Sequence, residues 1–235
     1  MIATPQGTII ALSNGAVPGQ RPLAYAAEYL SDVLSSRQIT HLPFAAVRPT
    51  DPTQIREALR SMGASGVETI EDPRHAAGAV RDADVILVTG GNTFLLLSAL
   101  QRHGVVAPIQ EAVNRGATYM GISAGTNVLS PTIATTNSMP IASPSALGAL
   151  GLLPVQLNVH YPGPQTDPNH SGESRDDRIS EYVHHNNRPV LALREAAWLV
   201  KERGRLTLHG AGAREFDPRR PPTDHYAGAD LTHLL

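Results

Sequence analysis

The sequence Gly121-Ile122-Ser123-Ala124-Gly125 follows the short apolar run Thr118-Tyr119-Met120 and precedes residues that can begin a helix. A strand, a sharp turn that carries a serine, and a helix together form a nucleophile elbow. The residues beside the serine must be small because this turn is tight and often strained. The helix that follows points its N-terminus at the hydroxyl, where negative charge would develop. The same pentapeptide arises by chance in glycine-rich turns, so the rest of the chain has to support this interpretation.

Short apolar runs alternate with helical patterns on the N-terminal side of this turn. Continuous apolar runs are typical of strands buried on both faces of a sheet. Strands are expected at 8–12, 39–44, 67–70, 85–88 and 118–120, and helices at 23–34, 51–62, 72–80, 93–101 and 105–114. Repeated alternation with short connections predicts a mostly parallel sheet covered by helices on both faces. The ligand site of such a sheet lies beyond the carboxyl ends of its strands.

The second half of the chain has fewer regular patterns. Strands are expected at 155–160 and 190–193, a hairpin at 197–200 with 206–209, and a helix at 176–184. Residues 131–154 hold no long periodic segment. The last segment, 214–235, is polar and contains prolines, and no strand or helix is assigned to it.

Length and composition indicate a globular enzyme in one domain, residues 1–235. Hydrophobic residues make up 41% and charged residues 17% of the chain, and the net charge of −2 gives no reason to expect nucleic acid or an anionic membrane as partner. No apolar run approaches the ~20 residues of a membrane helix. The first residues lack the basic and apolar regions of a signal peptide, so a cytoplasmic location is expected.

The motif inventory excludes several kinds of site. The chain has no cysteine, which excludes disulfides, thiolate metal sites and a cysteine nucleophile. It also lacks His-Glu-x-x-His, an EF-hand loop and the phosphate-binding Gly-x-x-x-x-Gly-Lys-Ser/Thr. Neither a metal nor a nucleotide is therefore expected.

A nucleophilic serine needs a base that accepts its proton, and a third group must hold that base in the right tautomer. Of the ten histidines, His160 is the best placed, because it ends an expected strand beside a loop. His184 and His185 lie late in a helix, where a surface or dipole-compensating role is the alternative. His41 and His103 are expected to be structural.

The acid that orients the base has several candidates. Glu195 comes just after the apolar strand 190–193, although a surface glutamate paired with Arg194 is the alternative. Three further acids lie near His160 in the sequence: Asp167, Glu173 and Asp176.

An oxyanion hole is expected where two glycine-rich strand ends meet. Gly90 and Gly91 follow the strand 85–88 and offer a backbone N–H that no side chain blocks. Together with the N–H of Ala124, this group would supply two donors to an oxyanion. An ordinary turn is the alternative for a Gly-Gly pair.

Five motifs in this chain occur in one order that is far more specific than any single motif. They are Val88-Thr89-Gly90-Gly91-Asn92-Thr93-Phe94, Gly121-Ile122-Ser123-Ala124-Gly125, Pro131-Thr132-Ile133 with Thr135-Thr136-Asn137, Asn158-Val159-His160-Tyr161, and Leu193-Arg194-Glu195. The ordered set, which spans about Ile9 to Gly212, resembles peptidase E, the cytoplasmic aspartyl dipeptidase family that includes cyanophycinase-like relatives.

The resemblance implies a three-layer α/β/α sandwich like that of class I glutamine amidotransferases. The chain order Ser123, His160, Glu195 agrees, since α/β-hydrolases run serine, acid, histidine. The resemblance makes Ser123 the nucleophile of a covalent acyl-enzyme, His160 the general base and Glu195 the orienting acid. It makes Gly91 and Ala124 the oxyanion donors, and it implies no metal or other cofactor.

The family cleaves an N-terminal aspartate from short peptides and often forms homodimers. Arg175 lies in Gly172-Glu173-Ser174-Arg175, which resembles the family's Gly-Glu-Thr-Arg, and a guanidinium can grip a carboxylate through two parallel hydrogen bonds. The resemblance also places Gly90, Asn92 and Ser138 at the substrate.

The chain departs from the family at Ser138, because the aspartyl dipeptidases usually read Thr-Thr-Asn-Asp-Met-Pro at this place. A neutral hydroxyl removes a charge near the site, which argues against strict Asp-X specificity more than against hydrolysis. The alternatives are a cyanophycinase-like peptidase or an esterase on the same fold, and a non-catalytic protein that binds a short peptide.

Overall fold

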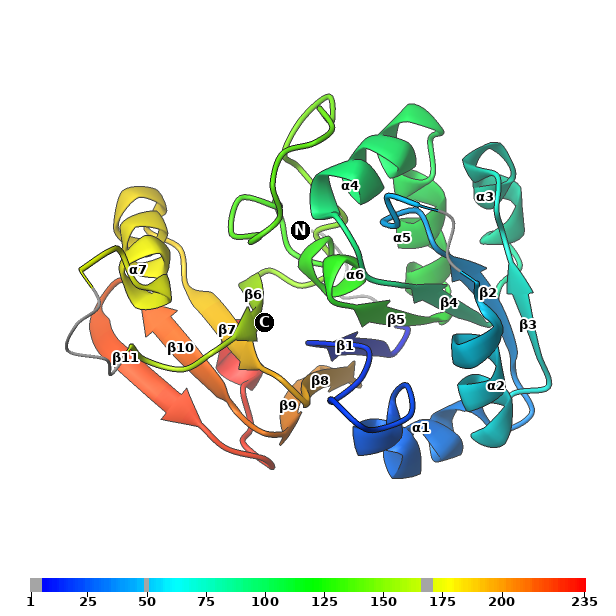
Figure 1. The fold of residues 1–235 in the computed structure, drawn as a ribbon, viewed down its shortest axis with the longest axis horizontal. Coiled ribbons are helices and arrows are strands. Elements are labelled where there is room, and N and C mark those ends of the chain that lie inside the picture. The colour runs from blue at the N-terminus through cyan, green and yellow to red at the C-terminus, as the bar shows by residue number, and fades with distance from the viewer. Residues whose placement is uncertain (1–5, 49–50, 166–170) are drawn as a thin grey trace.

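A seven-stranded sheet forms the centre of the computed structural model, which describes residues 6–48, 51–165 and 171–235. Its strand order is β3-β2-β4-β5-β1-β8-β9 (Figure 1). The strands are β1 Ile9–Leu12, β2 Gln38–Leu42, β3 Gly66–Thr69, β4 Val85–Val88, β5 Thr118–Ile122, β8 Ala197–Glu202 and β9 Arg205–Gly210. The first five pair in parallel, and β8 and β9 add an antiparallel hairpin next to β1. The mostly parallel sheet expected from the sequence is confirmed.

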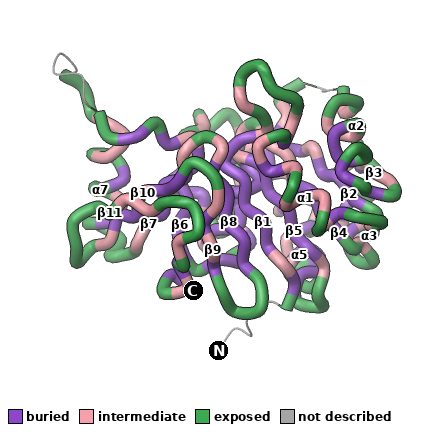
Figure 2. Tube along the Cα trace, turned by 90° about the horizontal axis from the view of Figure 1, so that it is seen from below, coloured by how far each residue is buried: buried purple, intermediate pink, exposed green. Residues whose placement is uncertain are grey.

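Helices cover both faces of this sheet because alternate residues of each strand point to opposite sides. Ile10 and Leu12 of β1 pack in a cluster with the 3₁₀ helix η1 (Ala24–Ala26), α1 (Ala27–Leu34) and α2 (Thr53–Ser61). Ile9 and Ala11 pack with α3 (Pro73–Ala79), α4 (Thr93–Arg102), α5 (Val106–Asn114) and α6 (Ala124–Asn127). Figure 2 shows the central strands as buried and the outer helix faces as exposed. These are the three layers of an α/β/α sandwich.

A second sheet lies beside the first, with the order β11-β10-β7-β6. Its strands are β6 Gln156–Tyr161, β7 Val190–Arg194, β10 Ala213–Asp217 and β11 Arg220–His225. Helix α7 (Arg175–Asn186) covers one face through Ile179 and Val183, which pack against Tyr161 and Phe216. Residues of the other face, such as Leu157 and Leu193, join the buried cluster under α4 and α5. The two sheets therefore share one core.

Strands β10 and β11 are absent from the sequence-based expectation, which gave 214–235 no regular element. Strand β11 is an edge strand whose first four residues are exposed, so its polar residues need no buried face. Pro221 and Pro222 fit there, since an edge strand leaves positions where no N–H is needed for pairing. The chain ends in a short 3₁₀ helix, η2 (Thr232–Leu234). None of the helices in the described ranges is long and apolar enough to cross a membrane.

Candidate active site

Ser123 occupies the sharp turn between β5 and α6. Its φ of 53° and ψ of −106° lie where residues with a Cβ are strained, and the surrounding structure must hold such a conformation. The turn fits because Gly125 touches the end of β4: a Cβ built on it would lie 2.0 Å from the carbonyl oxygen of Val88. The backbone N–H of Ser123 donates to the carbonyl oxygen of Leu12 at 3.0 Å. The serine is thus fixed at the carboxyl end of the central strands.

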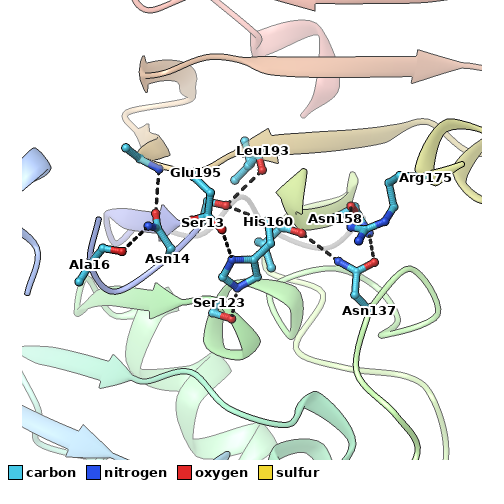
Figure 3. Close-up of polar contacts among 12 residues, drawn as sticks. Ser13, Asn14, Ala16, Ser123, Asn137, Asn158, His160, Arg175, Leu193 and Glu195 are labelled. Carbon is cyan, nitrogen blue, oxygen red and sulfur yellow. Dashed lines mark hydrogen bonds and ion pairs between the residues drawn. The ribbon is translucent and has the colours of Figure 1, made fainter. Parts of the chain in front are cut away.

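His160 is the second-last residue of strand β6 and faces Ser123 (Figure 3). The Nε2 atom of His160 is 2.7 Å from the Oγ of Ser123. His160 also has a positive φ of 57°, and the pairing of β6 with β7 shifts register between Asn158 and Tyr161. This bulge turns the imidazole out of the second sheet and toward the first.

Glu195 follows β7 in the turn to β8, and its Oε1 lies 2.7 Å from the Nδ1 of His160. The His160 and Glu195 side chains are 40% and 55% exposed. Water screens the electrostatic attraction in a contact so open to solvent, so the contact is suited mainly to fixing the tautomer and direction of the ring. Serine, histidine and glutamate form a continuous chain of contacts.

The rival acids and bases lie elsewhere. Asp176 accepts a 2.6 Å hydrogen bond from the hydroxyl of Tyr161, whose pKa burial raises well above its ordinary value. Asp167 lies outside the described residues, and Glu173 is exposed just before α7. His41 is buried between the hydroxyls of two threonines. His103, His184 and His185 end helices.

The Gly90-Gly91 turn passes directly against Ser123. A Cβ built on Gly90 would lie 3.0 Å from the Cβ of Ser123, and one built on Gly91 would lie 2.2 Å from the carbonyl oxygen of Ala45. Gly91 has a φ of 141°, so both space and conformation require glycine. Ala124 is the first residue of α6, and its N–H has no acceptor within the helix. The two glycine-rich strand ends meet, as their positions after parallel strands predict.

A polar pocket of about 320 Å³ opens between the segment 134–139, β6 and the start of α7. Figure 3 shows its residues Asn137, Asn158 and Arg175 beside His160. Arg175 donates from Nη1 to the Oδ1 of Asn158 at 3.1 Å, and Asn158 donates to the Oδ1 of Asn137 at 3.0 Å. The buried Nε of Arg175 has no hydrogen-bond partner among the described residues. Burial, together with the like charge of Arg178, lowers the pKa of Arg175 because its positive charge lacks compensation. An anion in this pocket would supply the opposite charge and be stabilised by it.

Asn92 and Ser138 connect this pocket to the glycine turn. Asn92 caps α4 by accepting the N–H of Leu95 at 3.1 Å, and its Nδ2 donates to the carbonyl oxygen of Met139 at 2.7 Å. The Oγ of Ser138 accepts the N–H of Thr93 at 3.1 Å. Both residues therefore join the segment 134–139 to α4.

Two buried polar residues beside the site, Ser13 and Asn14, were missed by the sequence analysis, which ended the expected strand at residue 12 and gave them no role. Their side chains bond to the backbone of His160 and of Ala196. Polar residues that directly follow a fully buried central strand are the signal that indicates them. In the described part of the chain, no group of three histidine, aspartate or glutamate side chains has an arrangement that could hold a metal ion.

The sequence of this chain is similar to a known family of peptidases. The family model described as peptidase family S51 matches residues 9–209. The chain belongs to peptidase family S51. A protein named peptidase E from Streptomyces coelicolor is 38% identical over 232 residues, which cover 97% of this chain and 94% of that protein. A peptidase E from Citrobacter koseri is 41% identical over 209 residues, which cover 86% of this chain and 90% of that protein. The resemblance inferred from the five motifs is confirmed, and the chain is a serine-type peptidase.

Solved structures support the fold assigned to this S51 member. The crystal structure of a peptidase from an acI-B1 Actinobacterium matches with a TM-score of 0.74 at 17% identity and covers 97% of each chain. A putative peptidase E protein from Listeria monocytogenes matches with a TM-score of 0.66 at 21% identity, covering 87% of this chain and 98% of that one. At these identities the likeness shows the fold alone.

Proposed function

We propose that this S51 peptidase hydrolyses short peptides as a dipeptidase, through a Ser123-His160-Glu195 triad and a covalent acyl-enzyme. The observation that carries the proposal is the chain of two 2.7 Å contacts from Ser123 Oγ through the imidazole to Glu195. Nε2 is placed to accept the hydroxyl proton while Nδ1–H donates to the carboxylate. Serine becomes a nucleophile only with such a partner.

The reaction proceeds in two steps. Ser123 Oγ bonds to the scissile carbonyl carbon as its proton passes to His160 Nε2, and the carbonyl oxygen takes the negative charge. The N–H groups of Gly91 and Ala124 are proposed to stabilise this oxyanion. The tetrahedral intermediate then expels the amine, which takes the proton from His160. Water, deprotonated by the same imidazole, attacks the ester carbonyl carbon. The bond to Ser123 Oγ then breaks, Oγ takes the proton back from His160 Nε2, and the acid is released.

The pocket beside His160 favours an acidic residue at the N-terminal side of the scissile bond. Its described lining holds two guanidiniums, Arg175 and Arg178, and the amides of Asn137 and Asn158, but no carboxylate. Arg175 would bind a carboxylate through the Nε that lacks a partner. Ser138 contributes a neutral hydroxyl to this lining. We infer that Asp-X peptides are accepted and that the preference is broader than for aspartate alone.

Substitution of the nucleophile tests the mechanism. Ser123→Ala is expected to abolish release of amino acid from Asp-Leu and to abolish labelling by a serine-directed phosphonate, while circular dichroism shows an intact fold. A protein that still turns over substrate after this change would not use Ser123. If the natural protein itself is neither labelled by the phosphonate nor active on any peptide, it is a peptide-binding protein instead.

A substrate panel tests the specificity. Free amino acid is measured from X-Leu dipeptides, from N-blocked and longer versions, and from a β-linked Asp-Arg dipeptide and p-nitrophenyl esters. Arg175→Gln is expected to raise KM for Asp-Leu by about tenfold or more, because a charge-assisted bond is lost. Arg178→Gln, at the exposed rim of the pocket, is expected to change KM less and serves as the control. An unchanged KM in Arg175→Gln would remove Arg175 from substrate recognition.

A further inference from the structure

Two polar side chains just after the central strand β1 bond to the backbone of the proposed base and to the backbone beside the proposed acid. Ser13 and Asn14 directly follow β1 and are 0% and 5% exposed. The Oγ of Ser13 accepts the backbone N–H of His160 at 2.9 Å and donates to the carbonyl oxygen of Leu193 at 3.1 Å. The Oδ1 of Asn14 accepts the backbone N–H of Ala196 at 2.8 Å. Figure 3 shows both side chains between the two sheets.

The backbone held in this way is strained. His160 has a φ of 57° and Ala196, the residue after Glu195, has a φ of 58°. A left-handed conformation is unfavourable for residues with a Cβ and persists only where the surroundings determine it. Because the β6–β7 pairing is interrupted between Asn158 and Tyr161, the His160 N–H bonds to the side chain of Ser13, just after β1, rather than to a strand partner.

Because the side chains of the proposed base and acid are exposed, their backbone conformation largely determines where they point. His160 and Glu195 are 40% and 55% exposed, so packing around the rings and carboxylate restrains them little. Their direction then depends on the φ and ψ angles of the residues that carry them. Asn14 is itself fixed, since its Nδ2 donates to the carbonyl oxygen of Ala16 at 2.7 Å and its own carbonyl accepts the hydroxyl of Tyr25 at 2.5 Å.

We propose that Ser13 and Asn14 are positioning residues for hydrolysis: Ser13 sets the backbone of the base, and Asn14 sets the turn that carries the acid. The inference rests on the proposed roles of His160 and Glu195. A displacement of about 1 Å at a reacting group can lower the rate about 10²-fold. Loss of either contact should therefore lower kcat while substrate binding in the Arg175 pocket persists.

Ser130 provides a matched control. It is also 0% exposed, and its Oγ accepts the N–H of Leu157 at 2.9 Å in the same strand β6. Ser130→Ala leaves a buried N–H of the same strand β6 without its partner, but at the end of the strand away from the base. Ser13→Ala and Asn14→Ala are compared with it in steady-state kinetics with Asp-Leu, in labelling rate with a serine-directed phosphonate, and in urea unfolding.

Ser13→Ala and Asn14→Ala are expected to lower kcat and the phosphonate labelling rate by about 10²-fold with KM changed less than about threefold. Ser130→Ala is expected to retain kcat within about threefold at a similar loss of stability. Ser13→Thr keeps the hydroxyl and is expected to recover most of the kcat lost in Ser13→Ala. Rates in both alanine variants equal to those of Ser130→Ala, or no recovery in a folded Ser13→Thr, would overturn the inference.

The two proposals fail in different ways. If Ser123→Ala stays active, the proposed triad is wrong. If Ser123→Ala is inactive but folded Ser13→Ala and Asn14→Ala keep full kcat, only the positioning role is wrong. If Ser13→Ala does not fold, Asn14→Ala, which acts on the other turn, decides the question by the same comparison of kcat, KM and labelling.

Discussion

At Gly91 a single hydrogen atom in place of a side chain lets the backbone pass directly against Ala45. Gly91→Ala would place a Cβ 2.2 Å from the carbonyl oxygen of Ala45 at a φ of 141°, so the peptide must move. Because the proposed oxyanion donor moves with it, kcat for dipeptide hydrolysis is expected to fall about 10²-fold or more. Steady-state kinetics on folded protein measures this loss.

Gly104 provides the control for this prediction. It also has a positive φ, 64°, but nothing lies within 4 Å of a Cβ built there. Gly104→Ala is expected to cost roughly 1–2 kcal/mol of stability through backbone strain and to leave kcat unchanged. Equal kcat values in the two variants would show that Gly91 supplies no oxyanion donor.

At the residue scale, local chemistry in the sequence identifies some of the site and misses the rest. Ser123 lies in a contiguous pentapeptide, and His160 and Glu195 each end an apolar strand, so all three are detectable; they lie in contact, and their roles stay predictions. The position of Ser13 and Asn14 just after a buried strand marks them as candidates. They bond to residues about 150 to 180 positions away in the chain, and no local pattern shows which partners they have.

At the scale of elements, ion pairs hold α7 and three strands of the second sheet together. The Asp224 carboxylate of β11 accepts from Arg194 of β7 at 3.0 Å and from Arg214 of β10 at 2.9 Å, and Arg214 lies 3.5 Å from Asp176 of α7. Arg194 and Asp176 are the sequence neighbours of Glu195 and Arg175. The network therefore links the segment that carries the proposed acid, Glu195, to the pocket that Arg175 lines.

Asp224→Asn is expected to destabilise the protein by about 1–3 kcal/mol, because two half-buried guanidiniums lose their shared charge partner. Asp230→Asn is the control, since the side chains of Asp230 and of its partner Arg205 are 50% and 69% exposed. Such a surface pair contributes about 0–1 kcal/mol. Urea unfolding of both variants measures the difference. Equal losses of unfolding free energy would show that the network adds nothing beyond a surface ion pair.

Charged residues with partners in other elements explain why strand β10 of the second sheet is hard to recognise in the sequence. The central strands β1, β4 and β5 of the large sheet are buried on both faces, so short hydrophobic runs indicate them. In β10 the charged residues Arg214 and Glu215 interrupt the pattern, and Glu215 is buried because Arg220, His225 and His233 bond to its carboxylate. Compensation by residues of other elements cannot be inferred from the composition of one segment.

At the scale of the whole molecule, the proposed active site is assembled from both sheets. Ser123 follows a strand of the large sheet, whereas His160 and the approach to Glu195 come from β6 and β7 of the small one. Residues of both sheets share one buried cluster, so the packing between them sets the distance from serine to imidazole. The homodimer and the cytoplasmic location stay predictions; sedimentation equilibrium of the purified chain tests the first.

Global stability is expected to depend on pH through His41, which lies 2% exposed at the end of β2 with its ring nitrogens against Thr69 and Thr89. Burial, with a smaller contribution from Arg56, lowers the pKa of His41 from 6.5 to about 4. Between these two values the unfolded chain binds a proton that the folded protein does not, so stability falls as pH falls. At 1.36 kcal/mol per pH unit, the loss on going from pH 7 to pH 4 is about 3 kcal/mol.

His41→Gln keeps polar groups between the two threonines and removes the titration. Its unfolding free energy, measured in urea from pH 7 to pH 4, is expected to fall less steeply than that of the natural protein by up to about 3 kcal/mol over the range. His184→Gln, on the exposed side of α7, is expected to leave the slope unchanged. A parallel pH dependence in His41→Gln and the natural protein would mean that His41 takes up its proton in the folded state as readily as in the unfolded chain, and that other groups cause the loss in acid.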